Sequence, residues 1–123
     1  MKHLKTYKLF ESVGNDLPDI LIEINDEPLW KAECWADSQI GKWVVIIQTV
    51  DEDDEYELEG QTPPPVVIET IERSIDFMNS EGFDNYQITF ETDEDDQIEE
   101  ISLQEVSELD VWPNNFIRIE FWK

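Results

Sequence analysis

The sequence predicts a single α+β domain, with an antiparallel or mixed β-sheet of about five to seven strands and one main α-helix (about 65–80) packed on one face. Several segments alternate apolar and polar residues with the period of a strand, and one repeats apolar residues with the period of a helix. The length of 123 residues suits one ordinary domain and not two. Hydrophobic residues make up 40% of the chain, well above the content of highly charged disordered chains. Residues 1–123 are therefore expected to form one acidic α+β domain.

The N-terminal segments are predicted to be strands. Residues 19–25 place three isoleucines on one face of an extended chain, Ile20, Ile22 and Ile24. Residues 29–36 alternate again, and the turn residues Asn25-Asp26-Glu27-Pro28 between the two segments predict a β-hairpin. Residues 5–13 are predicted as a first strand, although Lys2, Lys5 and Lys8 also fit one face of a helix.

Further strands are predicted in the rest of the chain. Residues 42–50 are apolar at both odd and even positions, as expected of a central strand that is covered on both faces. Residues 85–92 and 115–122 alternate apolar with polar side chains. Residues 97–109 are ambiguous, because Gln97–Leu103 can pair back on 85–92 and Gln104–Leu109 can form a short helix.

The main helix has clear start and stop signals. It is preceded by Thr62-Pro63-Pro64-Pro65, and proline suits the first helical turn. Apolar residues then recur at helical spacing, Ile68, Ile71, Ile75 and Met78. Gly82 supplies the C-terminal stop. The triple proline is interpreted as a lead-in to this helix and not as a domain boundary.

Two acidic runs carry much of the net charge of −23. Residues 51–59 and 91–100 hold 14 of the 31 acids, and like charges this close weaken the compact state. Each run follows a predicted strand, and the predicted helix lies between them in sequence. If the two strands are parallel neighbours joined by a right-handed crossover, both runs leave the same end of the sheet and form one negative surface. A strand at Tyr56–Glu59 that pairs back on 43–50 would instead make the first run a hairpin tip.

No residue pattern points to catalysis or to a metal site. His3 is the only histidine, and Cys34 falls on the apolar face of its predicted strand. The start of the second run, Asp93-x-Asp95-x-Gln97, resembles an EF-hand loop, but Ile98 occupies the glycine position and Gln104 the final glutamate position. No enzyme activity, cofactor or metal ligand is therefore predicted.

Charge and composition also bear on location and partners. The surface repels nucleic acid and anionic lipid, so neither direct nucleic-acid binding nor a membrane role is expected. The longest apolar stretch, Trp43–Ile47, is far shorter than a membrane span, and Met1–Phe10 has no signal-peptide pattern. A cytoplasmic location is expected, and the lone Cys34 fits a reducing compartment.

The predicted function is that of a non-enzymatic acidic binding protein that inhibits a basic nucleic-acid-handling protein, such as a nuclease. In size and charge alone the chain resembles small acidic inhibitors, namely immunity proteins of bacterial toxin systems and phage proteins that mimic DNA. Carboxylates spaced like phosphates can occupy a basic groove and exclude its substrate. The predicted partner-binding residues are Asp51, Glu52, Asp53, Asp54, Glu55, Glu57, Glu59, Asp93, Glu94, Asp95, Asp96, Glu99, Glu100 and Trp35.

Two alternatives stay open. The acidic runs can be solvated loops that keep the protein in solution. The chain can also be a structural or adaptor domain that self-associates, as a homodimer for example, or binds a partner through an exposed aromatic sheet face. Trp35 shares its side of a predicted strand with Lys31 and Glu33, and large aromatics on a polar face are frequent interface anchors. On the last strand, the aromatics Phe116 and Trp122 likewise share a face with the charged residues Arg118 and Glu120.

Overall fold

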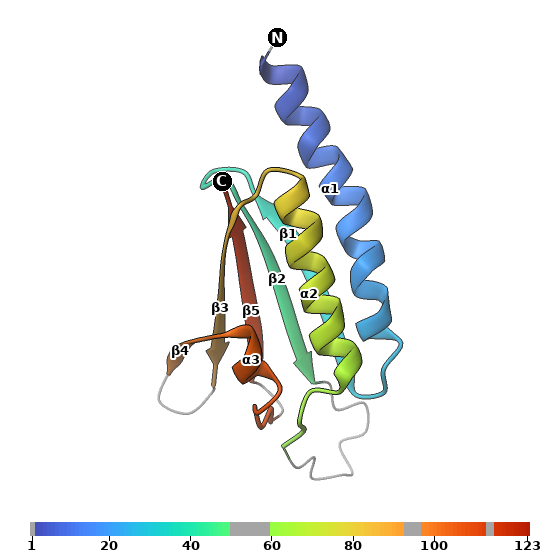
Figure 1. Cartoon of the computed structure of the whole chain (residues 1–123), viewed down its shortest axis with the longest axis vertical. Helices are drawn as coiled ribbons and strands as arrows, with labels where there is room; N and C mark the ends of the chain where they lie inside the picture. Colours follow the sequence, from blue (N-terminus) through green and yellow to red (C-terminus); the bar gives the residue numbers. More distant parts are fainter. Residues whose placement is uncertain (1, 50–59, 93–96, 113–114) are drawn as a thin grey trace.

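The structure is a computed structural model that describes residues 2–49, 60–92, 97–112 and 115–123 (Figure 1). It confirms the predicted α+β class, with a five-stranded antiparallel sheet in the order β1-β2-β5-β3-β4. The elements in chain order are α1 (Lys2–Asn25), β1 (Trp30–Asp37), β2 (Lys42–Thr49), α2 (Pro65–Ser80), β3 (Asn85–Glu91), β4 (Ile98–Ile101), α3 (Leu103–Val106) and β5 (Phe116–Trp122).

The last strand, β5, lies in the middle of the sheet. It pairs antiparallel with β2 on one side and with β3 on the other, so β2 and β3 run in the same direction without touching. The prediction that these two strands could be parallel neighbours is therefore wrong. Both edges of β2 are occupied, by β1 and β5. The alternative strand is predicted at Tyr56–Glu59. Those four residues lie outside the described part of the chain.

The N-terminal segment is a helix, so the strands predicted at 5–13 and 19–25, and the hairpin that used the second of them, are wrong. Helix α1 continues to Asn25. Its buried residues follow helical spacing, Val13, Leu17, Leu21 and Ile24. Ile22, which belongs to the alternating isoleucines, is 49% exposed. The leucine stripe therefore sets the conformation, despite the hydrogen bond that Pro18 removes from the helix.

Helix α2 begins and ends where the sequence predicts. Pro65 is its first residue, and Val67, Ile71 and Met78 are buried along one side. At the C-terminus the N–H of Gly82 donates to the Asn79 carbonyl at 3.1 Å, and the N–H of Phe83 to the Met78 carbonyl at 2.9 Å. This is a Schellman pair of hydrogen bonds, and it needs the left-handed φ of 94° that Gly82 adopts.

The helices cover one face of the sheet only. Figure 1 shows α1 and α2 side by side on the same side of the strands, and Arg73 of α2 forms an ion pair with Glu23 of α1. Under the helices the strands contribute alternate apolar residues to one core, including Val45, Ile47, Ile88, Ile117, Ile119 and Phe121. Each fully buried side chain of this size contributes about 1.5–3 kcal/mol.

Both sheet edges are blunted. At β1 the side chain of Asn25 acts like a neighbouring strand, because its Oδ1 accepts from the Ala32 N–H at 2.9 Å and its Nδ2 donates to the Ala32 carbonyl at 3.4 Å. At the other edge β4 has four residues, two of them glutamates. Short, charged and covered edges limit pairing with other chains.

The predicted pairing of Gln97–Leu103 with 85–92 is present as β4 on β3. The short helix predicted at Gln104–Leu109 is one turn, α3, which begins one residue earlier and ends at Val106. Ser102 and Glu105 form a capping box at its start, and Val106 is buried in the core.

Candidate functional site

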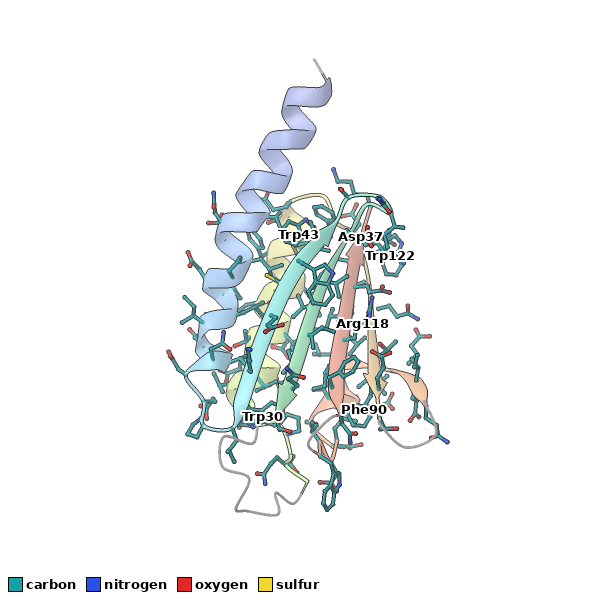
Figure 2. All side chains as sticks on the ribbon, turned by 180° about the vertical axis from the view of Figure 1, so that it is seen from behind. Trp30, Asp37, Trp43, Phe90, Arg118 and Trp122 are labelled. Carbon is teal, nitrogen blue, oxygen red and sulfur yellow. The ribbon has the colours of Figure 1, made fainter. Side chains whose placement is uncertain are left out.

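No described helix covers the face of the sheet opposite α1 and α2, which is called the open face below. Figure 2 looks onto this face, with the strands in front of both helices, and the labelled Asp37, Arg118 and Trp122 belong to it. Three adjacent strands, β1, β2 and β5, each contribute four alternate residues, which form the surface called the central patch below. These residues are Lys31, Glu33, Trp35, Asp37, Lys42, Val44, Ile46, Gln48, Phe116, Arg118, Glu120 and Trp122.

Aromatic and aliphatic side chains occupy the patch together with charged ones. Trp35 is 43% exposed, and Phe116, Trp122 and Ile46 are half-buried. Val44 is 1% exposed although no described helix covers it, because it stands in register between Trp35 on β1 and Glu120 on β5. The patch thus combines exposed aromatic surface with a buried aliphatic residue, a composition typical of interface centres.

Five of the six charged residues of the patch form ion pairs within the chain. Lys31 Nζ lies 2.8 Å from Glu33 Oε1, and Glu120 is shared by Arg118 at 3.3 Å and Lys42 at 3.8 Å. The ammonium of Lys42 also lies 5.0 Å from the ring centroid of Trp122. A cation–π contact of this kind contributes about 0.5–1 kcal/mol at an exposed site.

The patch has no net charge in a strongly acidic chain. It contains three bases (Lys31, Lys42, Arg118) and three acids (Glu33, Asp37, Glu120). Subtracting three of each from the 8 bases and 31 acids leaves 5 bases and 28 acids, so the whole charge of −23 lies elsewhere. The central patch and the acidic runs are therefore different kinds of surface.

A second region of interest is the end of the sheet at which β2 and β3 finish. Gln48 near the end of β2 and Glu91 at the end of β3 both pair with Phe116 of β5, so the two strands finish at the same level with one strand between them. That separation is about 10 Å. The chain therefore leaves β2 and β3 at the same end of the sheet, and β5, not direct pairing, brings the two strand ends together.

Most of the predicted acidic site residues lie outside the described part of the chain. These are Asp51, Glu52, Asp53, Asp54, Glu55, Glu57 and Glu59 of the first run, and Asp93, Glu94, Asp95 and Asp96 of the second. Glu99 and Glu100 are exposed on the edge strand β4. Trp35, the remaining predicted site residue, lies on the open face.

Several residues of the central patch were not predicted as site residues. Val44 and Ile46 lie on β2, which carries apolar residues on both of its faces. Its sequence therefore suggests a strand that is covered on both sides. The signal that this face is open comes from the neighbouring strands. At Lys31 and Glu33, and at Arg118 and Glu120, the alternation places ionic residues on the same face as the aromatics.

Cys34 is half-buried on the helix side of β1. Burial raises the pKa of its thiol, which lowers the fraction of reactive thiolate at neutral pH. Beside it is a shallow pocket of about 350 Å³, lined in part by Pro18, Leu21 and Asn25 of α1. Within the described ranges no three His, Cys, Asp or Glu side chains are grouped so as to hold a metal ion.

Comparison with protein-family models, with curated proteins and with solved structures gives no match. In the part of the chain that the structure describes, no helix is both long and apolar enough to cross a membrane. What this protein does is therefore inferred from its own geometry and charge.

Proposed function

We propose that this chain is a non-enzymatic acidic binding protein that inhibits a basic nucleic-acid-handling protein through its clustered carboxylates. The observation that carries the proposal is the common end of β2 and β3, from which both acidic runs start. Fourteen of the 31 acids belong to these two runs, residues 51–59 and 91–100. The strand ends from which the two runs continue are about 10 Å apart.

The concentration of charge has a cost that a basic partner removes. Carboxylates close together repel one another in the free protein, and a groove lined by Lys and Arg converts that repulsion into attraction. The same field steers the two proteins together before contact, so association is fast at low ionic strength. A negative surface in such a groove occupies the place of the nucleic-acid backbone.

Inhibition by occupation requires charge and shape but no reacting group. The proposed partner is a nuclease or another protein with a basic groove. The proposal includes no direct binding of this chain to nucleic acid or to a membrane. The proposed location is the cytoplasm, where a lone thiol such as Cys34 stays reduced. Toxin immunity and evasion of a host defence both fit this mechanism.

Displacement of nucleic acid tests the proposal. A basic protein captured on the immobilised chain at low salt is purified and bound to a fluorescently labelled DNA duplex, and the chain is then titrated in. The duplex should be released in proportion to the chain added. The matched control carries six Asp→Asn changes, at Asp51, Asp53, Asp54, Asp93, Asp95 and Asp96, and should release far less. A complex in which chain and duplex bind the captured protein together without mutual weakening would contradict the proposal.

A second candidate function is favoured by the open sheet face. Trp35 is 43% exposed in a surface that has no net charge, which suits a structural or adaptor domain that binds through apolar contact. Salt separates the two candidates. Binding through the acidic runs should weaken steeply as salt rises, whereas binding through the central patch should persist.

A further inference from the structure

We propose that the central patch is the interface of a homodimer, in which two copies of this chain pack open face to open face about a two-fold axis that crosses β1, β2 and β5 near their midpoints. This inference deepens the second candidate function and rests on it. It does not depend on the inhibitor proposal, because it concerns the chain alone and uses none of the residues of the acidic runs.

Charge selects the occupant of the patch. A basic partner would be drawn to the acidic residues and not to a surface whose three acids and three bases cancel. The rest of the chain carries the charge of −23, which repels an acidic partner and a second copy alike until salt screens it. A second copy nevertheless brings an equally neutral patch, whose charges complement those of the first copy when the strands are reversed. Glu91 and Glu100 of the second acidic run lie on the same face but on β3 and β4, beside the patch.

The register makes each strand complementary to itself when it is reversed. A two-fold axis across the strands exchanges residues at equal distances from Cys34 on β1, Val45 on β2 and Ile119 on β5. On β1, Lys31 then faces Asp37 of the second copy. On β5, Arg118 faces Glu120 and Phe116 faces Trp122, and on β2 the aliphatic Val44 faces Ile46. Each contact occurs twice, as in every isologous interface, and each of these four joins groups of opposite charge or of like polarity. The remaining two contacts place Glu33 opposite Trp35 and Lys42 opposite Gln48.

Sheets that pack face to face cross at about 30°, which leaves facing residues in place near the axis and displaces them toward the strand ends. At Lys31, three residues from the midpoint of β1, the displacement is on the order of 5 Å and within reach of a lysine side chain. Lys31 is free to respond, because its side chain and that of its partner Glu33 are 49% and 52% exposed.

The other two-fold arrangement is disfavoured by charge. An axis that runs along β2 would place each β2 residue against its own copy, and Lys42 would then face Lys42 of the second copy. Like charges opposed in a contact destabilise it. The crossing axis opposes no two like charges within the central patch, and we therefore assign the dimer to it.

The dimer should be of moderate affinity. Strands of about eight residues, three strands wide, give a flat footprint on the order of 400 Å² per chain. A standard interface covers about 800 Å² per partner. A contact of about half this area belongs to the transient class of interfaces, so dimers should be sought with the protein at a concentration on the order of tens to hundreds of micromolar.

The test uses charge reversal at the two exposed ends of β1, measured by sedimentation of the whole chain at increasing concentration. The wild-type protein should shift from 14.5 kDa toward twice that mass. Asp37→Lys opposes two lysines twice in the dimer and Lys31→Asp opposes two aspartates twice, so each should weaken dimerisation about tenfold or more. The matched control, Asp76→Lys, makes the same charge change on the solvent side of α2 and should leave the dimer unchanged.

Mixing the two weakened variants gives the decisive result. In a mixed pair both lysines of one chain face both aspartates of the other, so a heterodimer should form with about the wild-type affinity. All variants should keep the wild-type melting temperature, which separates loss of dimer from loss of fold. A monomer at every concentration would overturn the inference, and so would a dimer that Asp37→Lys leaves intact or a mixture that stays monomeric. None of these results depends on a basic partner, so the inhibitor proposal stands or falls separately.

Discussion

The two faces of the sheet are built from the same strands but differ in how far their apolar side chains are buried. Under the helices Val45, Ile47 and Ile117 are completely buried, whereas on the open face Trp35 is 43% exposed and Ile46 is half-buried. A sheet face that only contacts solvent normally carries polar residues at these positions. The aromatics and aliphatics of the open face are therefore more than a solvent-facing sheet surface needs, and the proposed contact with a second copy would account for them.

The largest effect should come from the covered face. Ile71 of α2 is completely buried in the core, and Ile71→Ala should lower the free energy of unfolding by about 2–5 kcal/mol. Ile75 is only partly buried, so Ile75→Ala should fall at or below the lower end of this range. Urea denaturation measures both. A neutral result at both positions would show that this stripe of α2 is not core.

The next effect tests the edge where the two faces meet. Asn25→Ala removes both hydrogen bonds to the backbone of Ala32, and part-buried groups that lose a partner cost about 1–3 kcal/mol. Asn25→Asp keeps the acceptor and removes the donor, so it should cost less than Asn25→Ala. Hydrogen exchange of the Ala32 amide should speed up in the alanine variant. An unchanged exchange rate there would show that Asn25 does not protect this edge.

The open face should respond differently. Trp35→Ala should change the free energy of unfolding by about 1 kcal/mol or less, because the side chain is exposed and covers mainly Val44. Its effect should appear in binding instead, as faster dissociation from whatever occupies the face. A loss of stability as large as that of Ile71→Ala would mean that this face is a second core, and the contrast between the faces would not hold.

The smallest stability effect is expected for the acidic runs. The six Asp→Asn changes at positions 51, 53, 54, 93, 95 and 96 should leave the melting temperature equal or slightly higher, because they remove like-charge repulsion. Thermal unfolding at low ionic strength measures this most sensitively. A fall of many degrees would show that these carboxylates stabilise the fold, for example by holding a cation.

Local patterns predicted most of the elements and failed where two periods overlap. Helix α2 and its limits follow from Pro65, the isoleucine spacing and Gly82. In α1 the alternation of Ile20, Ile22 and Ile24 competes with the helical stripe through Leu17 and Leu21, and tertiary burial of the stripe decides the outcome. Sequence period alone does not reveal which of two compatible patterns will be buried.

The site was predictable in part for a related reason. Trp35 is separated from Lys31 and Glu33 by even numbers of residues, which predicts an aromatic side chain on a polar strand face. In the structure these three residues lie on the same face of β1. The position of β5 between β2 and β3 is a long-range choice that leaves no local trace, and it decides which strands share the open face. It also decides that both acidic runs start at one end of the sheet, which the sequence suggested through a different strand order.

The association rate with the captured basic partner tests the central claim most directly. Stopped-flow mixing compares the wild-type chain, the six-Asp→Asn variant and Trp35→Ala over a range of salt concentrations. If the clustered carboxylates steer binding, the six changes slow association at low salt by about tenfold or more, the difference shrinks as salt rises, and Trp35→Ala leaves association unchanged. Equal association rates for the wild-type chain and the six-Asp→Asn variant at low salt would contradict the claim that the acidic runs are the binding site.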